Sequence, residues 1–182
     1  TFLELPNGKL LVAGNFLGTN GNQSYRSLAR LNADGSLDSE FNAHLKNTVC
    51  SYHGPYAGWR CYTYSASLNG LTLQRNGKVL LAGSFTSVNS EPRNGVVRLN
   101  SDGSTDNSFE LEMNSEAVGH GTLVLKDGGI LIWGTFTTVN GVSQAYLVKV
   151  DENGFVDSSF APALNGPVYA AIQQSDGKIV IG

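Results

Sequence analysis

LQRNGKVLLAGSF, residues 73–85, is the stretch that decides the fold. It joins a turn dipeptide, Asn76-Gly77, to a short apolar run and a second glycine, and the same pattern occurs three more times. The other copies read LPNGKLLVAGNF (residues 5–16), LKDGGILIWGTF (residues 125–136) and QSDGKIVIG (residues 174–182). The turn glycines of the four copies stand 69, 51 and 49 residues apart. A recurring period of about 50 residues predicts a repeat architecture.

Within one repeat, the residue pattern predicts short antiparallel strands. Residues 68–74 alternate apolar and polar side chains, and Asn76-Gly77 after them predicts a type I′ hairpin turn. Residues 78–82 form a short apolar run, which is typical of a strand buried on both faces, and Phe85 after it is expected in the core. Residues 95–100 predict a third strand. Three to four strands in about 50 residues is the size of one propeller blade.

The repeats therefore predict an all-β fold. We expect a β-propeller-like array of about three and a half four-stranded antiparallel blades, as part of a larger propeller. A parallel β-helix is disfavoured because tight Asn-Gly hairpins join antiparallel strands, and a sandwich does not predict this period. The whole chain, 1–182, is expected to be one repeat region. Its units are residues 1–66 with an insertion at 46–65, then 67–117, 118–166 and a partial repeat at 167–182.

The repeated phrases resemble the delta-sixty repeat, a bacterial β-propeller family with the pattern DGKILVGGxF…VNG…RLNxDGxLDxxF. The first copy here reads NGKLLVAGNF…RLNADGSLDSEF and the second reads NGKVLLAGSF…VNS…RLNSDGSTDNSF. The resemblance covers the chain except about residues 44–66. It implies a propeller fold and a long secreted or surface protein, so the expected location is extracellular or at the cell surface.

Composition and charge exclude several functional classes. The chain has a net charge of −3 and a sequence pI of about 5.5, and no basic patch stands out, so nucleic acid is not an expected partner. No apolar run approaches the ~20 residues that a membrane-spanning helix needs.

A carboxylate-rich turn follows the third predicted strand of each full repeat. Alternating oxygen side chains, a glycine and a later carboxylate resemble a calcium-binding loop, so calcium is the one cofactor considered. A basic residue (Arg30, Arg98 or Lys149) occupies the first position of that pattern and offers an alternative, because it can pair with the carboxylates in place of an ion. An Asx-type turn is the remaining alternative. The candidate ligands are Asn32, Asp34, Asp38, Asn100, Asp102, Asp106, Asp151, Asn153 and Asp157.

The insertion at residues 46–65 contains both cysteines of the chain, Cys50 and Cys61. The segment shows no regular pattern of its own, so it is expected to be an irregular loop. A disulfide between the two cysteines would hold such a loop in an oxidising compartment, and the alternative is two free thiols. A zinc site is not expected from a single cysteine pair.

Aromatic side chains are concentrated in the same insertion, which holds five of the nine Tyr and Trp residues. Tyr52, Tyr56, Trp59 and Tyr62 are the candidate binding residues, because flat rings suit stacking on sugars or contact with a partner protein. The alternative is that these rings form a small local core around the disulfide.

No catalytic constellation is present in the sequence, and we expect a protein that is not an enzyme. The histidines are scattered, and neither a G-x-S-x-G nucleophile motif nor an H-E-x-x-H zinc motif occurs. The expected function is a structural or adhesion module that binds protein partners or further copies of itself through open sheet edges. The alternative is a carbohydrate-binding or carbohydrate-active propeller, for which glycans would be the ligands.

Overall fold

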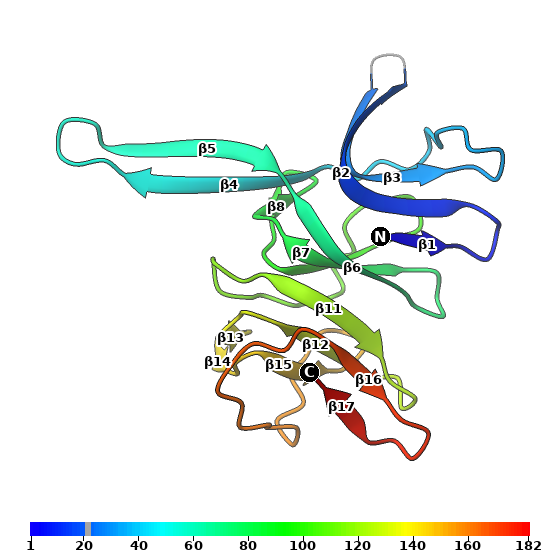
Figure 1. Ribbon diagram of the computed structural model, residues 1–182, viewed down its shortest axis with the longest axis vertical. Coiled ribbons are helices and arrows are strands. Elements are labelled where there is room, and N and C mark those ends of the chain that lie inside the picture. Colours follow the sequence, from blue (N-terminus) through cyan, green and yellow to red (C-terminus); the bar gives the residue numbers. More distant parts are fainter. Residues whose placement is uncertain (21–22) are drawn as a thin grey trace.

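The computed structural model describes residues 1–20 and 23–182, and these residues form seventeen strands and no helix (Figure 1). Three of the sheets contain three strands each, and they correspond to the first three repeats. These sheets are β1 (Phe2–Glu4), β2 (Leu10–Asn20) and β3 (Gln23–Leu31); β6 (Ser67–Leu73), β7 (Val79–Ser84) and β10 (Val96–Leu99); and β11 (Gly119–Val124), β12 (Ile130–Gly134) and β15 (Leu147–Val150). The fold is thus all-β, as predicted.

Short hairpins complete the architecture. The last repeat contributes the pair β16 (Ala171–Gln173) and β17 (Ile179–Ile181). Small hairpins formed by β8 (Ser87–Val88) with β9 (Glu91–Pro92) and by β13 (Thr138–Val139) with β14 (Val142–Ser143) lie after the middle strands of the second and third sheets. The insertion forms β4 (Leu45–Tyr52) and β5 (Trp59–Ser65).

Each full blade has three regular strands, where four were expected. The segment after the carboxylate turn makes a single antiparallel bridge to the third strand of its own sheet, as Thr105 does to Leu99. Equivalent bridges join Leu37 to Leu31 and Val156 to Val150. The segment then leaves the sheet because its phenylalanine enters the space between blades, where Phe41 and Phe109 are buried.

The turn within each repeated phrase differs from the expected type I′ turn. The amide of Gly77 donates to the carbonyl of Gln74, and the amide of Gln74 donates to the carbonyl of Lys78. Gly77 has a positive φ of 80°, whereas Asn76 does not. A type I′ turn needs positive φ at both central residues. The loop is therefore a type I turn followed by glycine in the left-handed region.

The sheets stack face to face, so the middle strands are buried on both sides, as the sequence predicted. In β7, Val79 and Leu81 belong to the core shared with the first sheet, whereas Leu80 and Ala82 belong to the core shared with the third. Phe85 is also buried, as predicted. A third core joins β12 to the last repeat through Leu131 and Trp133.

The insertion is a regular hairpin, so the expectation of an irregular loop is wrong. The two strands β4 and β5 pair over seven positions, from Lys46 opposite Ser65 to Tyr52 opposite Trp59. Figure 1 shows this hairpin extending away from the stacked sheets. Its base is anchored where Leu45 and Lys46 pair with β8. Alternating polarity is missing from its sequence because neither face of most of the hairpin is buried, although its β-branched and aromatic residues are typical of strands.

Within the residues that the structure describes, no helix has the length and apolar character to cross a membrane.

Candidate functional site

The carboxylate turns are joined by ion pairs to the strands of their own repeat. Asp38 accepts hydrogen bonds at Oδ2 from Lys9 Nζ (2.7 Å) and Arg30 Nε (2.6 Å). In the next repeat, Asp106 accepts at Oδ2 from Lys78 Nζ (2.7 Å) and Arg98 Nε (2.5 Å). Both carboxylates are buried. Each carboxylate therefore already has two basic partners.

The two arginines also link neighbouring blades. Arg30 donates from Nη1 to the carbonyl of Ser101, and Arg98 donates from Nη1 to the carbonyl of Glu152 in the following repeat. The Arg98 guanidinium lies 4.5 Å from the centre of the Phe109 ring, a distance at which the cation is attracted to the aromatic face. One arginine thus connects a carboxylate and an aromatic ring of its own repeat to the backbone of the next.

The third repeat has a more exposed version of the same pairing. Lys149 occupies the arginine position and contacts Asp127 (2.8 Å) and Asp157 (3.3 Å). Asp157 is about one third exposed, whereas the side chains of Asp38 and Asp106 are 4% and 7% exposed. A lysine lacks the fork of donors that allows arginine to reach a carboxylate and a neighbouring carbonyl together.

The remaining turn residues form Asx-type turns. Asp34 accepts hydrogen bonds at Oδ1 from the amide (2.9 Å) and the hydroxyl (2.6 Å) of Ser36, and Asn32 donates to the same hydroxyl. The equivalent contacts occur among Asn100, Asp102 and Ser104. Asp151 accepts from the amides of Asn153 and Phe155, while the Asn153 carbonyl accepts from Glu110.

Calcium binding by these turns stays a prediction that these contacts do not favour. Among the described residues, no three Asp, Glu, His or Cys side chains cluster as they would to hold a metal ion. Asp38 and Asp106 face a guanidinium where a calcium ion would lie, so they fit the cation alternative better than the ion. The residues Asn32, Asp34, Asn100, Asp102, Asp151, Asn153 and Asp157 instead take part in the turns and the exposed pair described above.

The carboxyl groups of Asp38 and Asp106 have lowered pKa values. Burial alone would raise the pKa of Asp106, but hydrogen bonds from Lys78, Ser108 and Arg98 outweigh it and keep the pKa well below its ordinary value. At Asp38, burial is likewise outweighed by hydrogen bonds from Lys9, the Glu40 amide and Arg30. Both groups are therefore ionised at neutral pH and stabilise the folded state as carboxylates.

Two asparagines form a second set of links that the sequence analysis did not single out. Asn140 accepts at Oδ1 from the Glu112 amide (2.7 Å) and donates from Nδ2 to the carbonyls of Glu110 (2.9 Å) and Gly154 (3.0 Å). Asn89 accepts from the His44 amide and donates to the Gly103 carbonyl in the same way. The shared dipeptide Val-Asn of the two repeats was the available signal. Both asparagines have positive φ, which asparagine tolerates better than most residues.

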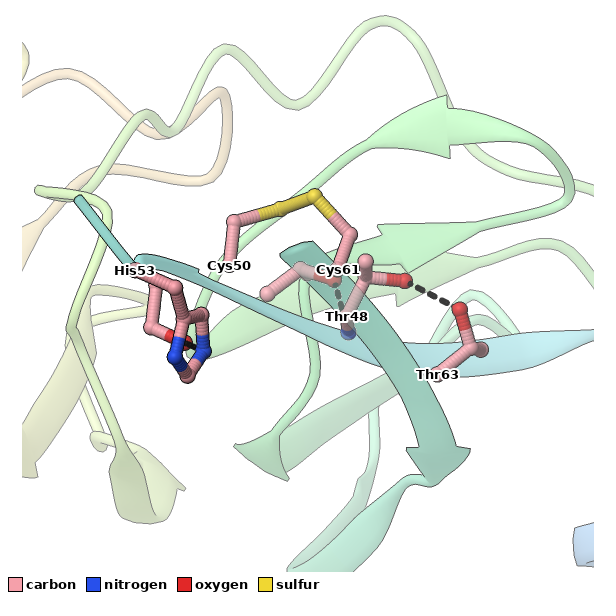
Figure 2. Close-up of a disulfide and its surroundings, with 7 residues drawn as sticks. Thr48, Cys50, His53, Cys61 and Thr63 are labelled. Atoms are coloured by element: carbon pink, nitrogen blue, oxygen red, sulfur yellow. Dashed lines mark hydrogen bonds between the residues drawn. A yellow bond between two sulfur atoms is a disulfide. The ribbon is translucent and has the colours of Figure 1, made fainter. Parts of the chain in front are cut away.

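The β4–β5 hairpin is closed by a disulfide, as predicted. Cys50 and Cys61 lie directly opposite each other in the register, with Cα atoms 4.0 Å apart, and they are bonded. Figure 2 shows the disulfide beside the cross-strand hydrogen bond between Thr48 and Thr63, whose hydroxyl oxygens are 3.0 Å apart. Both contacts fix the pairing of the two strands.

The aromatic side chains of the hairpin are exposed. Tyr56 at the tip is fully exposed, Trp59 is 71% exposed, and Tyr52 and Tyr62 are each more than half exposed. The alternative that these rings form a local core is therefore wrong. A core is excluded because the hairpin projects from the sheets and, among the described residues, no other element covers it.

The hairpin distributes the candidate binding residues over two faces. Opposed residues of an antiparallel pair lie on the same side, so Tyr52 and Trp59 share a face with the disulfide, and their ring centres are 5.7 Å apart. Tyr62 lies on the other face. Tyr64, which was not among the candidate binding residues, shares that face because it is two positions further along β5. Its exposed side chain adds a second ring to this face.

Comparison with known proteins supports the propeller architecture. A family model described as a domain of unknown function (DUF5122), beta-propeller, matches residues 5–41, 74–109 and 125–160. Each matched segment begins at or next to the repeated phrase and ends at or near the phenylalanine after the carboxylate turn, while the hairpin lies between two matched segments. No curated protein matches the chain. Because the matched segments make up more than half of its residues, the chain belongs to the DUF5122 beta-propeller family.

Proposed function

We propose that the chain is a non-enzymatic binding and adhesion module that works outside the cell, and that the β4–β5 hairpin is its binding element. The observation that carries the proposal is the hairpin itself. It projects from the blades and presents five aromatic side chains that are each more than half exposed. Clustered exposed apolar side chains on a protein surface are typical of interaction sites.

The disulfide supports a location outside the cell. Disulfides persist in oxidising compartments and are rare where glutathione keeps thiols reduced. Cys50 and Cys61 are both exposed, so no covering structure would protect the bond from a reducing cytosol. If the protein is exported, thiol labelling without reductant should find neither cysteine reactive in material taken directly from the source cells. Reactive thiols in most of that material would contradict the location.

The role of the carboxylates supports binding over catalysis. Asp38 and Asp106 have lowered pKa values and are held by two basic side chains each, so they neither accept nor release protons near neutral pH. A general acid or base needs a pKa near the working pH. These carboxylates act in the packing of the blades.

Two finer expectations belong to the same proposal. Self-assembly through open sheet edges is supported by β5, because β5 is the edge strand of the sheet that it forms with β4, β8 and β9. Membership of the delta-sixty repeats, within the wider propeller family, is supported by the phrases RLNADGSLDSEF and RLNSDGSTDNSF.

The proposal is tested by removing the hairpin. Lys46 lies opposite Ser65, so replacing residues 47–64 with Asn-Gly would join them by a two-residue turn and leave the blades intact. The intact chain and the shortened chain would each be applied to surfaces coated with polygalacturonate, dextran, gelatin or the intact chain. We expect the intact chain to be retained on at least one coating and the shortened chain on none. Equal retention of both proteins on every coating, or no retention at all, would contradict the proposal.

A further inference from the structure

We propose that one face of the hairpin binds a carboxylated polysaccharide. The inference rests on the proposed function, since it names the ligand class of the same binding element. The face consists of Arg60, Tyr62 and Tyr64, and is called the Arg–Tyr face below. The three residues occupy every second position of β5, and side chains at that spacing lie on one side of a strand.

The Arg–Tyr face is a straight and accessible row. A strand rises about 3.3 Å per residue, so neighbouring side chains of the row are about 7 Å apart and the row is about 13 Å long. Tyr62 and Tyr64 are 51% and 57% exposed. The residues opposite the row on β4 have shorter side chains, and they are Ser51, Val49 and Asn47. A linear ligand can therefore lie along β5 in contact with all three side chains.

The two rings favour a sugar over a purely apolar ligand. A tyrosine combines a flat apolar ring with a hydroxyl group at its tip. A pyranose ring has the complementary character, with C–H groups on its faces and hydroxyl groups around its edge. Tyr62 and Tyr64 would stack on sugar faces while their hydroxyls exchange hydrogen bonds with sugar hydroxyls.

The charge of the hairpin favours an acidic ligand. Residues 45–65 include Lys46 and Arg60 and no Asp or Glu, although the whole chain has a net charge of −3. The hairpin is thus a cationic element of an acidic protein. Arg60 makes no ion pair with any side chain that the structure describes. Its guanidinium can bind a sugar carboxylate through two parallel hydrogen bonds.

A second copy of the chain fits this face less well. Pairing two hairpins edge to edge would bring two cationic elements together without a carboxylate between them, and like charges in contact weaken association. A carboxylated polymer neutralises the arginine in each contact. The disulfide between Cys50 and Cys61 keeps β5 paired with β4, and this pairing holds the row in the extended strand.

The test measures binding of the folded, oxidised chain to polygalacturonate and to the same polymer with its carboxyl groups methyl-esterified. We expect the wild type to bind polygalacturonate at least about tenfold more tightly than the ester, because the ester cannot form the charge-assisted pair. Arg60→Gln, and Tyr62→Ala combined with Tyr64→Ala, should each weaken binding by about tenfold or more.

Two variants away from the Arg–Tyr face serve as matched controls. Lys46→Gln removes the same charge from the opposite face of the hairpin, and Tyr169→Ala removes an exposed tyrosine ring outside the hairpin. Both controls should bind polygalacturonate within about twofold of the wild type, since neither side chain touches the ligand. All the substituted residues are exposed, so each variant should fold, and thermal unfolding would check this.

Several results would overturn the inference. Equal loss of binding in Lys46→Gln and Arg60→Gln would show unspecific attraction between charges. Equal binding of polygalacturonate and its methyl ester would show that the carboxylate does not contribute to binding. The inference would also be overturned if the chain did not bind polygalacturonate but was retained on gelatin through the hairpin. The same holds if the chain did not bind polygalacturonate but self-associated in a way that the tyrosine variant lost. Either result would leave the proposed function standing. The proposed function is tested by a different result: it fails if removing the hairpin leaves the retention of the chain unchanged on every coating.

Discussion

Asp106 is a buried, charged residue whose partner Arg98 also contacts the next blade. Its carboxylate binds Lys78 and Arg98, and Arg98 reaches the carbonyl of Glu152 in the next repeat. A buried carboxylate without partners would be strongly unfavourable, so the two basic residues are needed for it to remain ionised. The loop resembles a calcium loop in sequence, yet the guanidinium supplies the positive charge within the chain itself.

Replacing Asp106 with asparagine should destabilise the fold and change its response to acid. We expect a loss of about 2–3 kcal/mol in unfolding free energy at pH 7, because Arg98 and Lys78 lose their partner. The folded pKa of Asp106 is lowered. Its stabilisation is therefore complete above the unfolded pKa, near pH 4, and is lost as the pH falls further.

Denaturant unfolding between pH 7 and pH 2 measures this effect. The wild type should lose stability below about pH 4, and Asp106→Asn should lose less over the same range. Asp176→Asn is the control, because Asp176 forms an exposed pair with Lys178, and it should unfold much as the wild type does. A steeper acid response in Asp106→Asn than in the wild type would contradict the assignment.

At the scale of strands and turns, two glycines of similar backbone shape have different surroundings. Gly103 and Gly128 both have a φ of +89°, in the left-handed region. A Cβ on Gly103 would lie 2.9 Å from backbone atoms of Asn42 in the preceding repeat, while a Cβ on Gly128 would meet nothing within 4 Å. The first glycine is thus required by packing between blades as well as by backbone conformation.

Alanine substitutions at the two glycines should separate these requirements. Both variants lose about 1 kcal/mol from the left-handed conformation. Gly103→Ala should lose a further 1–3 kcal/mol, roughly, because backbone atoms of Asn42 must move. Chemical denaturation of the two variants gives the difference. Equal destabilisation would show that the Asn42 contact does not constrain the turn.

The disulfide should stabilise the hairpin but not the blades. A two-stranded hairpin is marginally stable by itself, and β4–β5 is anchored to the blades only at its base. In a Cys50→Ser, Cys61→Ser variant, chymotrypsin should cleave within residues 52–64 about tenfold faster than in the oxidised wild type. Thermal unfolding followed at the buried Trp133 should change little. A large drop in that melting temperature would show that the hairpin supports the blades.

At the scale of the molecule, the protein is a stack in which each sheet shares one core with each neighbour. Leu80 and Leu81 are adjacent and completely buried, yet they belong to different cores. The stability of such an array is approximately a sum of the repeats and the contacts between neighbours. Apart from Leu45 at its base, the hairpin lies outside these cores, so binding through it requires no rearrangement of the stack.

Alanine substitutions at Leu80 and Leu81 should therefore loosen different neighbouring sheets, which lie on opposite sides of β7. Each should destabilise the protein by about 2–5 kcal/mol, since each leaves a cavity in a packed core. Hydrogen exchange in Leu80→Ala should accelerate in β12 and β15, and in Leu81→Ala in β2 and β3. Identical exchange patterns in the two variants would contradict the separation of the cores.

The sequence by itself determined the repeat and the buried middle strands, and it favoured the disulfide. Asn76-Gly77, the apolar run after it and Phe85 are local signals, because turn chemistry and side-chain periodicity depend on neighbouring residues. Only the tertiary structure decided that Arg98 pairs with Asp106, because that contact depends on how the turn and the strand meet. It also decided that residues 45–65 form a hairpin. Beyond Leu45 at its base, that segment buries neither face, so its sequence has no alternation of polarity from which the two strands could be predicted.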